Sequence, residues 1–143
     1  MAQPRSAFDA AYCALRVRDL STLELGERLA AKGFPETERQ DVIATLQRTG
    51  VLDERRFAQG RAASLASRGS GDLLIRDALV RVGVDPEVVE ETLAALEPEA
   101  DRARAVVAKR GAGPRTARYL RAKGFAYETV SAVVADEPVD EIG

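Results

Sequence analysis

The same short pattern closes three stretches of this chain: a leucine, three residues that a helix accepts, a glycine and one apolar residue. It occupies residues 29–34, 79–84 and 120–125. Each copy is typical of the end of an amphipathic helix, because glycine takes the left-handed backbone that closes the last turn and the apolar residue folds back onto the helix. Three such ends predict three copies of one unit, each too small to bury a core alone.

Capping signals and apolar spacing divide each unit into three helices. Residues 21–24 and 37–40 both fit the capping box, in which a Ser or Thr and a Glu or Gln three residues later satisfy each other's backbone N–H groups. Asp53, Asp72 and Asp85 are further candidates for N-caps. No useful length of the chain alternates apolar and polar residues with a period of two, so the sequence predicts an all-α fold of three tandem three-helix repeats.

The predicted parts of the chain follow from these boundaries. They are a disordered N-terminus over residues 1–7, three-helix repeats over residues 8–52, 53–97 and 98–135, and an acidic C-terminal tail over residues 136–143. Both ends lack helical periodicity, and chain ends without such a signal are commonly frayed.

Two expectations concern the first helix, over residues 8–17. Phe8, Tyr12 and Leu15 fall at i, i+4 and i+7, which predicts that they share the face turned to the core. Cys13 lies among apolar neighbours, so we expect a buried thiol that acts as a small hydrophobe; a reactive thiol is the alternative.

Composition excludes several classes of function. Histidine is absent and cysteine occurs once, which removes disulfides, Cys/His metal sites and every catalytic scheme that needs imidazole. We therefore expect no enzyme, no metal and no cofactor. The chain has no apolar run near the length of a membrane span and no basic-then-apolar leader, so we expect a cytoplasmic protein without a membrane segment.

The formal net charge of −2 conceals a segregation of charge along the chain. Residues 85–101 contain seven acidic residues and no basic one, whereas residues 102–123 contain eight basic residues and no acidic one. For a charged partner the local field matters more than the sum. We interpret the acidic stretch as a solvated helix face and the basic stretch as the principal candidate for binding.

The sharpest local signal is the helix predicted over residues 115–123. At 100° per residue, Arg118 and Arg121 lie at about 300° and 240° from Arg115, so the three arginines share one third of the helix. Thr116 and Leu120 fall on the other side. A face built only for solubility usually mixes charges of both signs, which favours a polyanion or an acidic protein groove over simple solvation. The primary candidates for binding are Arg102, Arg104, Lys109, Arg110, Arg115, Arg118, Arg121 and Lys123.

A secondary cluster follows the first helix of the second repeat. Its members are Arg55, Arg56, Arg61 and Arg68. Asp53 and Glu54 lie beside the first two and could pair with them for little net effect. Residues 68–71, Arg-Gly-Ser-Gly, lack the spacing and the Lys-Ser/Thr of a phosphate-binding loop and follow no strand, so we interpret them as a hinge between helices.

Four motifs in order resemble those of the RecX family, regulatory proteins that modulate the RecA recombinase. They are Arg-Asp-Leu-Ser-Thr-Leu-Glu-Leu at 18–25, Gly-Val-Leu-Asp-Glu-Arg-Arg-Phe-Ala at 50–58, the Gly, Ile, Leu and Gly-Val spacing of 71–84, and Tyr-Leu-Arg-Ala-Lys-Gly-Phe at 119–125. The resemblance extends from about Ala10 to Val134. Departures are mild: Glu54 replaces an aspartate, Lys123 an arginine and Ala78 a common glutamate.

The resemblance implies an elongated, curved array of repeats that lies in the helical groove of the RecA–DNA filament. Such a protein contacts RecA protomers and DNA there and suppresses ATP hydrolysis, strand exchange and co-protease activity in DNA repair, recombination and the SOS response. We expect the protein itself to be a monomer. The candidate cations would then contact RecA or single- or double-stranded DNA. Two alternatives stay open: a general nucleic-acid-binding helical module, and a helical-repeat scaffold for another protein.

Overall fold

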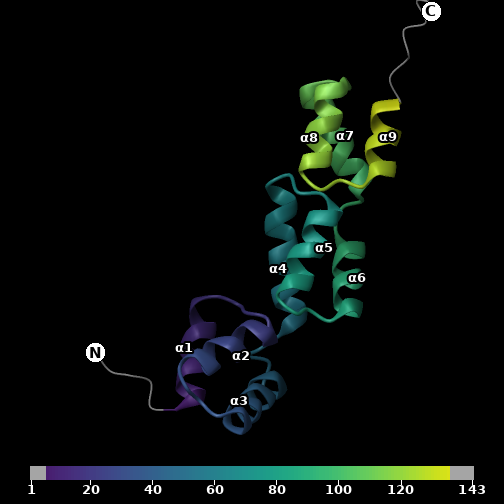
Figure 1. Ribbon diagram of the computed structural model, residues 1–143. Coiled ribbons are helices and arrows are strands. Elements are labelled where there is room, and N and C mark those ends of the chain that lie inside the picture. Colours follow the sequence, from purple (N-terminus) through teal and green to yellow (C-terminus); the bar gives the residue numbers. More distant parts are fainter. Residues whose placement is uncertain (1–5, 136–143) are drawn as a thin grey trace, which may run out of the picture. The chain divides into compact units, whose positions relative to one another are not determined.

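The computed structural model describes residues 6–135 (Figure 1). These residues form helices and connecting turns and contain no strand, which confirms the all-α fold. The helices are α1 Ala7–Val17, α2 Thr22–Ala31, α3 Glu36–Arg48, α4 Glu54–Ser67, α5 Asp72–Arg81, α6 Pro86–Ala95, α7 Glu99–Arg110, α8 Pro114–Ala122 and α9 Tyr127–Ala135. The disorder predicted for residues 1–7 is wrong for Ser6, which caps α1, and for Ala7, its buried first residue. Residues 1–5 and the predicted acidic tail over residues 136–143 lie outside the described residues. No helix in the described range is long and apolar enough to cross a membrane.

Backbone contacts divide the chain into two compact units. Unit 1 comprises Met1–Gly60 with Leu79–Val89, and unit 2 comprises Arg61–Ala78 with Glu90–Gly143. The division passes through α4, α5 and α6, so the middle three-helix segment contributes one end to each unit. The predicted boundaries of three repeats therefore stay a prediction.

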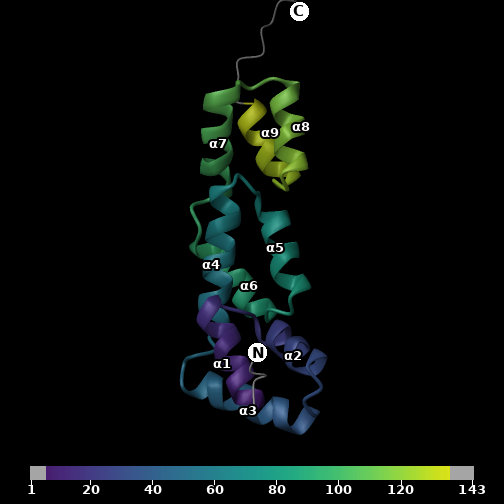
Figure 2. The same cartoon turned by 90° about the vertical axis from the view of Figure 1, so that its left-hand side faces the viewer.

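In unit 1, α1, α2 and α3 pack around a leucine core (Figures 1 and 2). Leu20, Leu25, Leu29 and Leu46 are each at most 1% exposed. The capping box at the start of α2 is confirmed, because the Ser21 hydroxyl accepts from the Glu24 N–H while the Glu24 carboxylate accepts from the Ser21 N–H.

The face that α1 turns to this core differs from the prediction. Its buried residues are Ala7, Ala10 and Ala11, with Ala14 and Leu15 packed at the edge. Phe8 and Tyr12 are 43% and 42% exposed and stack on each other with ring centroids 6.1 Å apart. Alanines at this spacing let the helix backbone lie close to its neighbours, which turns the larger rings outward. The prediction that Cys13 is buried is also wrong, since the structure leaves it exposed.

The N-caps predicted for three other helices, α3, α4 and α6, differ in outcome. The capping box expected at 37–40 is wrong: α3 begins at Glu36, and Pro35 takes the N-cap position with a φ of −62° and no side-chain bond. Proline already supplies helical φ and ends the preceding extended segment, so the helix starts before Thr37. Asp53 and Asp85 do accept from the N–H groups of Arg56 and Glu87, as expected of N-caps.

In unit 2, α7, α8 and α9 lie side by side in both views (Figures 1 and 2). Their core consists of Ala103, Leu120, Phe125, Val130 and Val133, each at most 3% exposed. The inward position expected for Leu120, on the side of its helix opposite the arginines, is confirmed. Gly111 has a φ of +88° and ends α7, and Pro114 follows as the first residue of α8. After this turn, α8 packs with its apolar side against α7 and α9.

Candidate functional site

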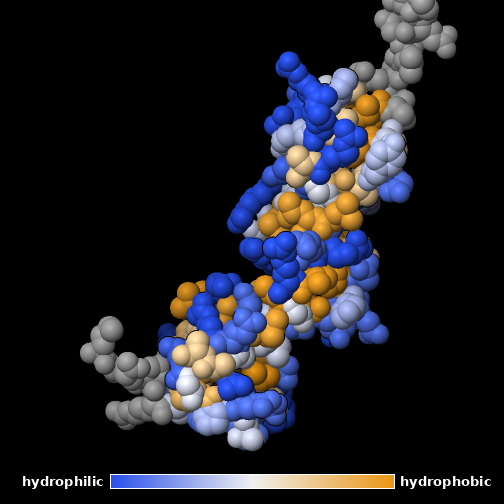
Figure 3. All heavy atoms as spheres, viewed as in Figure 1, coloured by the Kyte–Doolittle hydropathy of each residue, from blue (hydrophilic) through white to orange (hydrophobic). Residues whose placement is uncertain are grey.

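The arginine face of α8 is exposed as the helical spacing predicts. Thr116 and Leu120 are buried, and Arg115, Arg118 and Arg121 point away from them and are exposed. No acidic residue among the described ones forms an ion pair with any of the three arginines. Figure 3 shows strongly hydrophilic side chains gathered over α8. An unneutralised cationic stripe of this kind attracts anionic ligands.

The end of α7 adds two cations beside this helix. Lys109 and Arg110 are exposed. The Arg110 guanidinium lies over the ring of Tyr119, 3.6 Å from its centroid. This cation–π contact orients the guanidinium while leaving its N–H groups free for another ligand. Arg110 therefore belongs with the α8 cations.

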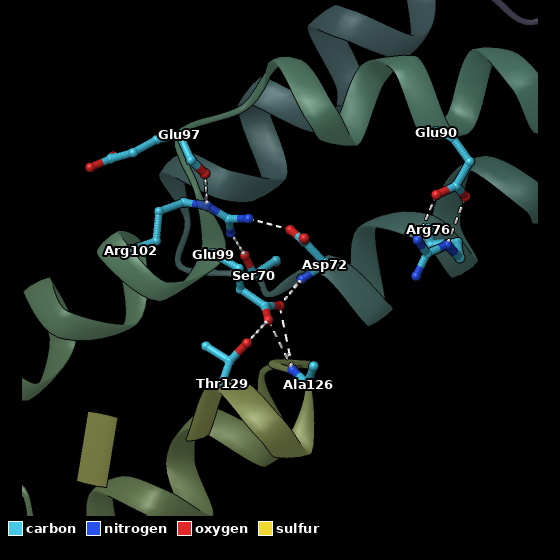
Figure 4. A network of polar contacts seen from close by, with 9 residues as sticks. All are labelled: Ser70, Asp72, Arg76, Glu90, Glu97, Glu99, Arg102, Ala126 and Thr129. Atoms are coloured by element: carbon cyan, nitrogen blue, oxygen red, sulfur yellow. Dashed lines mark hydrogen bonds and ion pairs between the residues drawn. The ribbon is translucent and has the colours of Figure 1, made fainter. Parts of the chain in front are cut away.

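The other two candidates on α7 are occupied by partners within the chain. Arg104 pairs with Asp101 at 2.9 Å, one turn earlier on the exposed surface. Arg102 has only 10% of its side chain exposed and donates to the Asp72 carboxylate and to the carbonyl oxygens of Ser70 and Glu97 (Figure 4). Its guanidinium lies buried between the start of α5 and the start of α7, and we assign it to the interior of unit 2.

Glu99, the first residue of α7, forms the second half of this buried network. One carboxylate oxygen accepts from the Asp72 N–H at 2.7 Å, and both oxygens lie within 3.4 Å of the Ala126 N–H (Figure 4). The Thr129 hydroxyl donates to the same carboxylate. A single side chain thus satisfies the free amides at the starts of α5 and α9, which no intrahelical bond can reach.

Two backbone hydrogen bonds complete the contact between the start of α5 and the end of α8. Gly71 N–H donates to the Lys123 carbonyl at 2.8 Å, and Leu73 N–H donates to the Gly124 carbonyl at 2.9 Å. Together with Glu99 and Arg102 these bonds attach the start of α5 to the end of α8. We call this arrangement the unit 2 joint. Asp72, expected as an N-cap, is instead the first residue of α5 and pairs with Arg102.

The same joint occurs in unit 1 with equivalent residues. Glu54, the first residue of α4, accepts from the Thr22 N–H at 3.1 Å and from the Asp85 N–H at 3.4 Å. The Ser21 hydroxyl donates to the Val82 carbonyl at 2.7 Å, in the position that the Gly71 N–H has in unit 2. We call this arrangement the unit 1 joint.

The secondary cluster divides between the two units. In unit 1, Arg56 donates from two nitrogens to Asp19, with the closest contact at 2.9 Å, and also to the Gly50 and Val51 carbonyls. This hydrogen bond to Asp19 raises the pKa of Arg56 above its ordinary value. Arg55 is exposed and lines a hollow of about 430 Å³ whose other residues include Glu54.

Arg61 and Arg68 belong to unit 2 and are exposed without an ion pair among the described residues. Arg68 precedes Gly69, where an added Cβ would lie 3.6 Å from Cε of Lys123 and 3.8 Å from the Tyr119 hydroxyl. The turn that follows α4 therefore lies close to the Lys123 side chain and to the Tyr119 hydroxyl. Lys123 is half-buried there, whereas Arg68 is exposed.

The hydrogen bonds of residues 68–71 bear on the phosphate-binding loop, and the hinge interpretation stays a prediction. The N–H groups of Ser70 and Gly71 donate to the carbonyls of Leu65 and Lys123, so neither is available to a phosphate. Among residues 6–135 there is also no group of three His, Cys, Asp or Glu side chains that could hold a metal ion.

Sequence reasoning missed the two joint carboxylates. The sequence places Glu99 in the stretch interpreted as a solvated helix face, and it places Glu54 beside arginines with which it could pair. The available signal was repetition, because a glutamate stands at the first position of both α4 and α7. A side chain that recurs at the same place in two repeats predicts a contact that recurs as well.

Comparison with known proteins gives a consistent result. A family model described as RecX, second three-helix domain, matches residues 53–93. A regulatory protein RecX from Halorhodospira halophila is 34% identical over 93% of this chain and 89% of its own length. A regulatory protein RecX from Chromohalobacter salexigens is 36% identical over 89% of this chain and 90% of its own length.

The fold also has a solved counterpart. The crystal structure of RecX from Lactobacillus salivarius superposes with a TM-score of 0.78, covering 90% of this chain and 92% of that chain at 15% sequence identity. At this identity the likeness concerns the fold.

Proposed function

This chain belongs to the RecX family of regulatory proteins, and from that membership we propose that it binds the RecA–DNA filament and lowers RecA activity without catalysing a reaction itself. The activities affected would be ATP hydrolysis, strand exchange and co-protease action, and so DNA repair, recombination and the SOS response. The filament is the proposed partner, with weaker binding to bare single- or double-stranded DNA.

The observation that carries the proposal is the unpaired arginine face of α8. Arg115, Arg118 and Arg121 are exposed, and the described residues supply no carboxylate to neutralise them. A nucleoprotein filament presents phosphates and acidic side chains at a regular spacing. Several modest ionic contacts made along such a partner add through effective concentration, and no chemical step is needed for a bound protein to obstruct its groove.

The first test measures ATP turnover by RecA on single-stranded DNA while the purified protein is added. We expect turnover to fall at less than one molecule per RecA protomer. The variant R115E/R118E/R121E should fold, because the buried residues of α8 are unchanged, and should lose most of the inhibition.

A matched control reverses three exposed arginines of unit 1 that have no ion pair among the described residues: R16E/R28E/R48E. It changes the net charge by the same amount and should keep the inhibition. Unchanged ATP turnover with equimolar wild-type protein would contradict the proposal.

Binding measurements separate the alternatives. A filament regulator should prefer RecA-coated DNA to bare DNA, whereas a general nucleic-acid module should bind both alike. A scaffold for another protein should bind neither.

A further inference from the structure

The arginine face of α8 has no anionic partner within residues 6–135. Arg115, Arg118 and Arg121 are exposed and form no ion pair with a described residue, whereas Arg76 and Arg104 of the same unit are paired with carboxylates. Residues three apart on a helix are neighbours, and like charges at such spacing repel each other. An anionic ligand that lies along this face would relieve the repulsion.

The chain itself supplies an acidic segment directly after α9. Residues 136–143 contain no basic residue and four acidic ones, which are Asp136, Glu137, Asp140 and Glu141. The carboxylates therefore come in two pairs, four residues apart along the chain. Their charge is opposite to that of the arginine face and similar in amount, so the two are electrostatically complementary.

The fold places the beginning of this segment beside the arginine face. Turns of only a few residues connect α7, α8 and α9, and the three helices share one core, so successive helices run in opposite directions. As a result α7 ends, α8 begins and α9 ends at the same end of the three-helix group (Figures 1 and 2). Ala135, the last residue of α9, therefore lies at the end of the group that carries Arg110 and Arg115.

The segment is long enough to follow the whole face. Eight residues of chain span at most about 27 Å, whereas Arg115 and Arg121 are separated by about 9 Å along the axis of α8. The chain between the two acidic pairs can span up to about 14 Å. The first pair can thus lie beside Arg115 while the second pair reaches Arg121.

We propose that the arginine face of α8 is a docking surface for residues 136–143 of the same chain, which occupy it in the free protein and must leave before another anion binds there. The inference goes beyond the proposed function, because it concerns the free protein and holds whatever the external ligand is. A single exposed ion pair contributes little. A segment attached to the neighbouring helix, however, is present at an effective concentration in the millimolar range, so several weak pairs hold it.

Two full-length variants that remove the same number of negative charges test this contact. The segment variant is D136N/E137Q/D140N/E141Q. The control variant, D9N/E27Q/D41N/E128Q, neutralises four exposed carboxylates that have no ion pair among the described residues. Each variant removes four negative charges and so raises the formal net charge from −2 to +2. A difference between them therefore reports where the charges lie and not their sum.

Nuclear magnetic resonance of the arginine Nε–H groups observes the contact directly. At low salt we expect the segment variant to shift the Nε–H signals of Arg115, Arg118 and Arg121 relative to wild type. The signal of Arg28, which is exposed on α2 in unit 1, should stay in place. At about 1 M salt, where the Debye length is about 3 Å, wild type and the segment variant should give the same signals.

Three results would overturn the docking surface. One is a segment variant whose α8 arginine signals match those of wild type at low salt. Another is an equal shift of these signals in the control variant. The third is a difference between wild type and the segment variant that grows with protein concentration, because the face would then hold the acidic segment of a second copy.

Competition with a small anion measures how often the segment covers the face. If it does so about nine-tenths of the time, a competing anion binds about tenfold more weakly. In calorimetric titrations with inorganic tripolyphosphate at low salt, we therefore expect the segment variant to bind about tenfold more tightly than wild type. The control variant should bind nearly as wild type does.

Removing the arginines shows whether the gain in affinity belongs to α8. Added to the segment variant, R115Q/R118Q/R121Q should abolish the tighter binding of tripolyphosphate. A gain that persists without these arginines, or an equal gain in the control variant, would overturn the inference. Neither measurement uses RecA, so the failure of this inference and the failure of the proposed function are separate results.

Discussion

The carboxylates of Glu54 and Glu99 each accept hydrogen bonds from the backbone amides that start two other helices. Each glutamate is the first residue of its own helix, at the same place in successive repeats. Each amide is one that its own helix cannot satisfy. The recurring element of this chain is therefore a joint as well as a helix triplet. Because each joint is complete inside its own unit, the two can be altered separately.

The three glycines of the repeated ending have different surroundings. Gly33, Gly83 and Gly124 all have positive φ, at 90°, 77° and 91°. At Gly33 an added Cβ would meet nothing within 4 Å, whereas at Gly124 it would lie 2.5 Å from Cβ of Leu74 and 2.8 Å from its backbone nitrogen. The ending is thus a helix stop in the first copy and a close contact with α5 in the third.

We expect Gly124→Ala to destabilise the protein much more than Gly33→Ala. Both substitutions force a side chain into left-handed backbone, at a cost of about 1–2 kcal/mol. Gly124→Ala also clashes with backbone that cannot move aside, which should add about 2 kcal/mol or more. Urea unfolding of the two variants measures the difference, and equal losses would contradict it.

Gly71→Ala separates the clash from the backbone strain. Gly71 has no positive φ, yet its Cβ would lie 2.4 Å from the Phe125 nitrogen and 2.5 Å from the Gly124 carbonyl. It should therefore resemble Gly124→Ala more than Gly33→Ala.

Local patterns predicted much of the fold and little of the joints. The three glycine endings and the capping box at Ser21 depend on residues within a turn of each other, and the structure confirms them. The faces of α1 could not be predicted as reliably, since which side is buried depends on how closely alanines let neighbouring helices approach. The bond from Asp72 to Glu99 spans 27 residues, a distance over which no helical period carries information.

The same limit applies to the candidate cations: local spacing does not predict their partners in distant parts of the chain. Spacing identified the exposed face of α8 correctly, because the spacing of residues within one helix determines which of them share a face. It could not separate Arg102 from Lys109, since the partners of Arg102 include a carboxylate 30 residues earlier in the chain.

We expect Arg102→Ala and Arg104→Ala to differ sharply in stability. Arg102→Ala leaves the partly buried Asp72 carboxylate and two carbonyls without their donor, which should cost about 2–3 kcal/mol. Arg104→Ala breaks an exposed pair with Asp101 and should cost at most about 0.5 kcal/mol. Chemical denaturation checks both. Arg102→Lys should not restore stability, because one ammonium cannot reach all three acceptors in the guanidinium geometry.

Cys13 should react as a surface thiol in the folded protein. It is exposed on α1, so a disulfide reagent such as DTNB should modify the native protein at a rate within about tenfold of that for the urea-unfolded chain. Cys13→Ser should change the free energy of unfolding by less than about 0.5 kcal/mol. Protection of the thiol until global unfolding would contradict the exposed position.

The pair of Arg76 and Glu90 should make part of the stability of unit 2 depend on pH. Arg76 donates to both oxygens of Glu90, at 3.1 and 2.9 Å (Figure 4), and this hydrogen bonding lowers the pKa of Glu90 below its ordinary value of 4.5. A carboxyl whose pKa is depressed in the folded state stabilises that state above the unfolded pKa, and the contribution is lost as pH falls through the folded pKa. Thermal unfolding of wild type and Glu90→Gln should therefore differ at pH 6–7 and converge as the pH falls below 4.5 and through the lowered pKa of Glu90.

The control for this pH effect is Glu27→Gln, which neutralises an exposed carboxylate of α2 that has no ion pair among the described residues. Its difference from wild type should not show the same convergence. High salt should also reduce the Glu90 effect at pH 7, since both side chains are partly exposed and salt screens their attraction. A difference between wild type and Glu90→Gln that grows as the pH falls would mean that Glu90 stabilises the protein in its protonated form, and the ion pair with Arg76 would then have no part in the acid dependence.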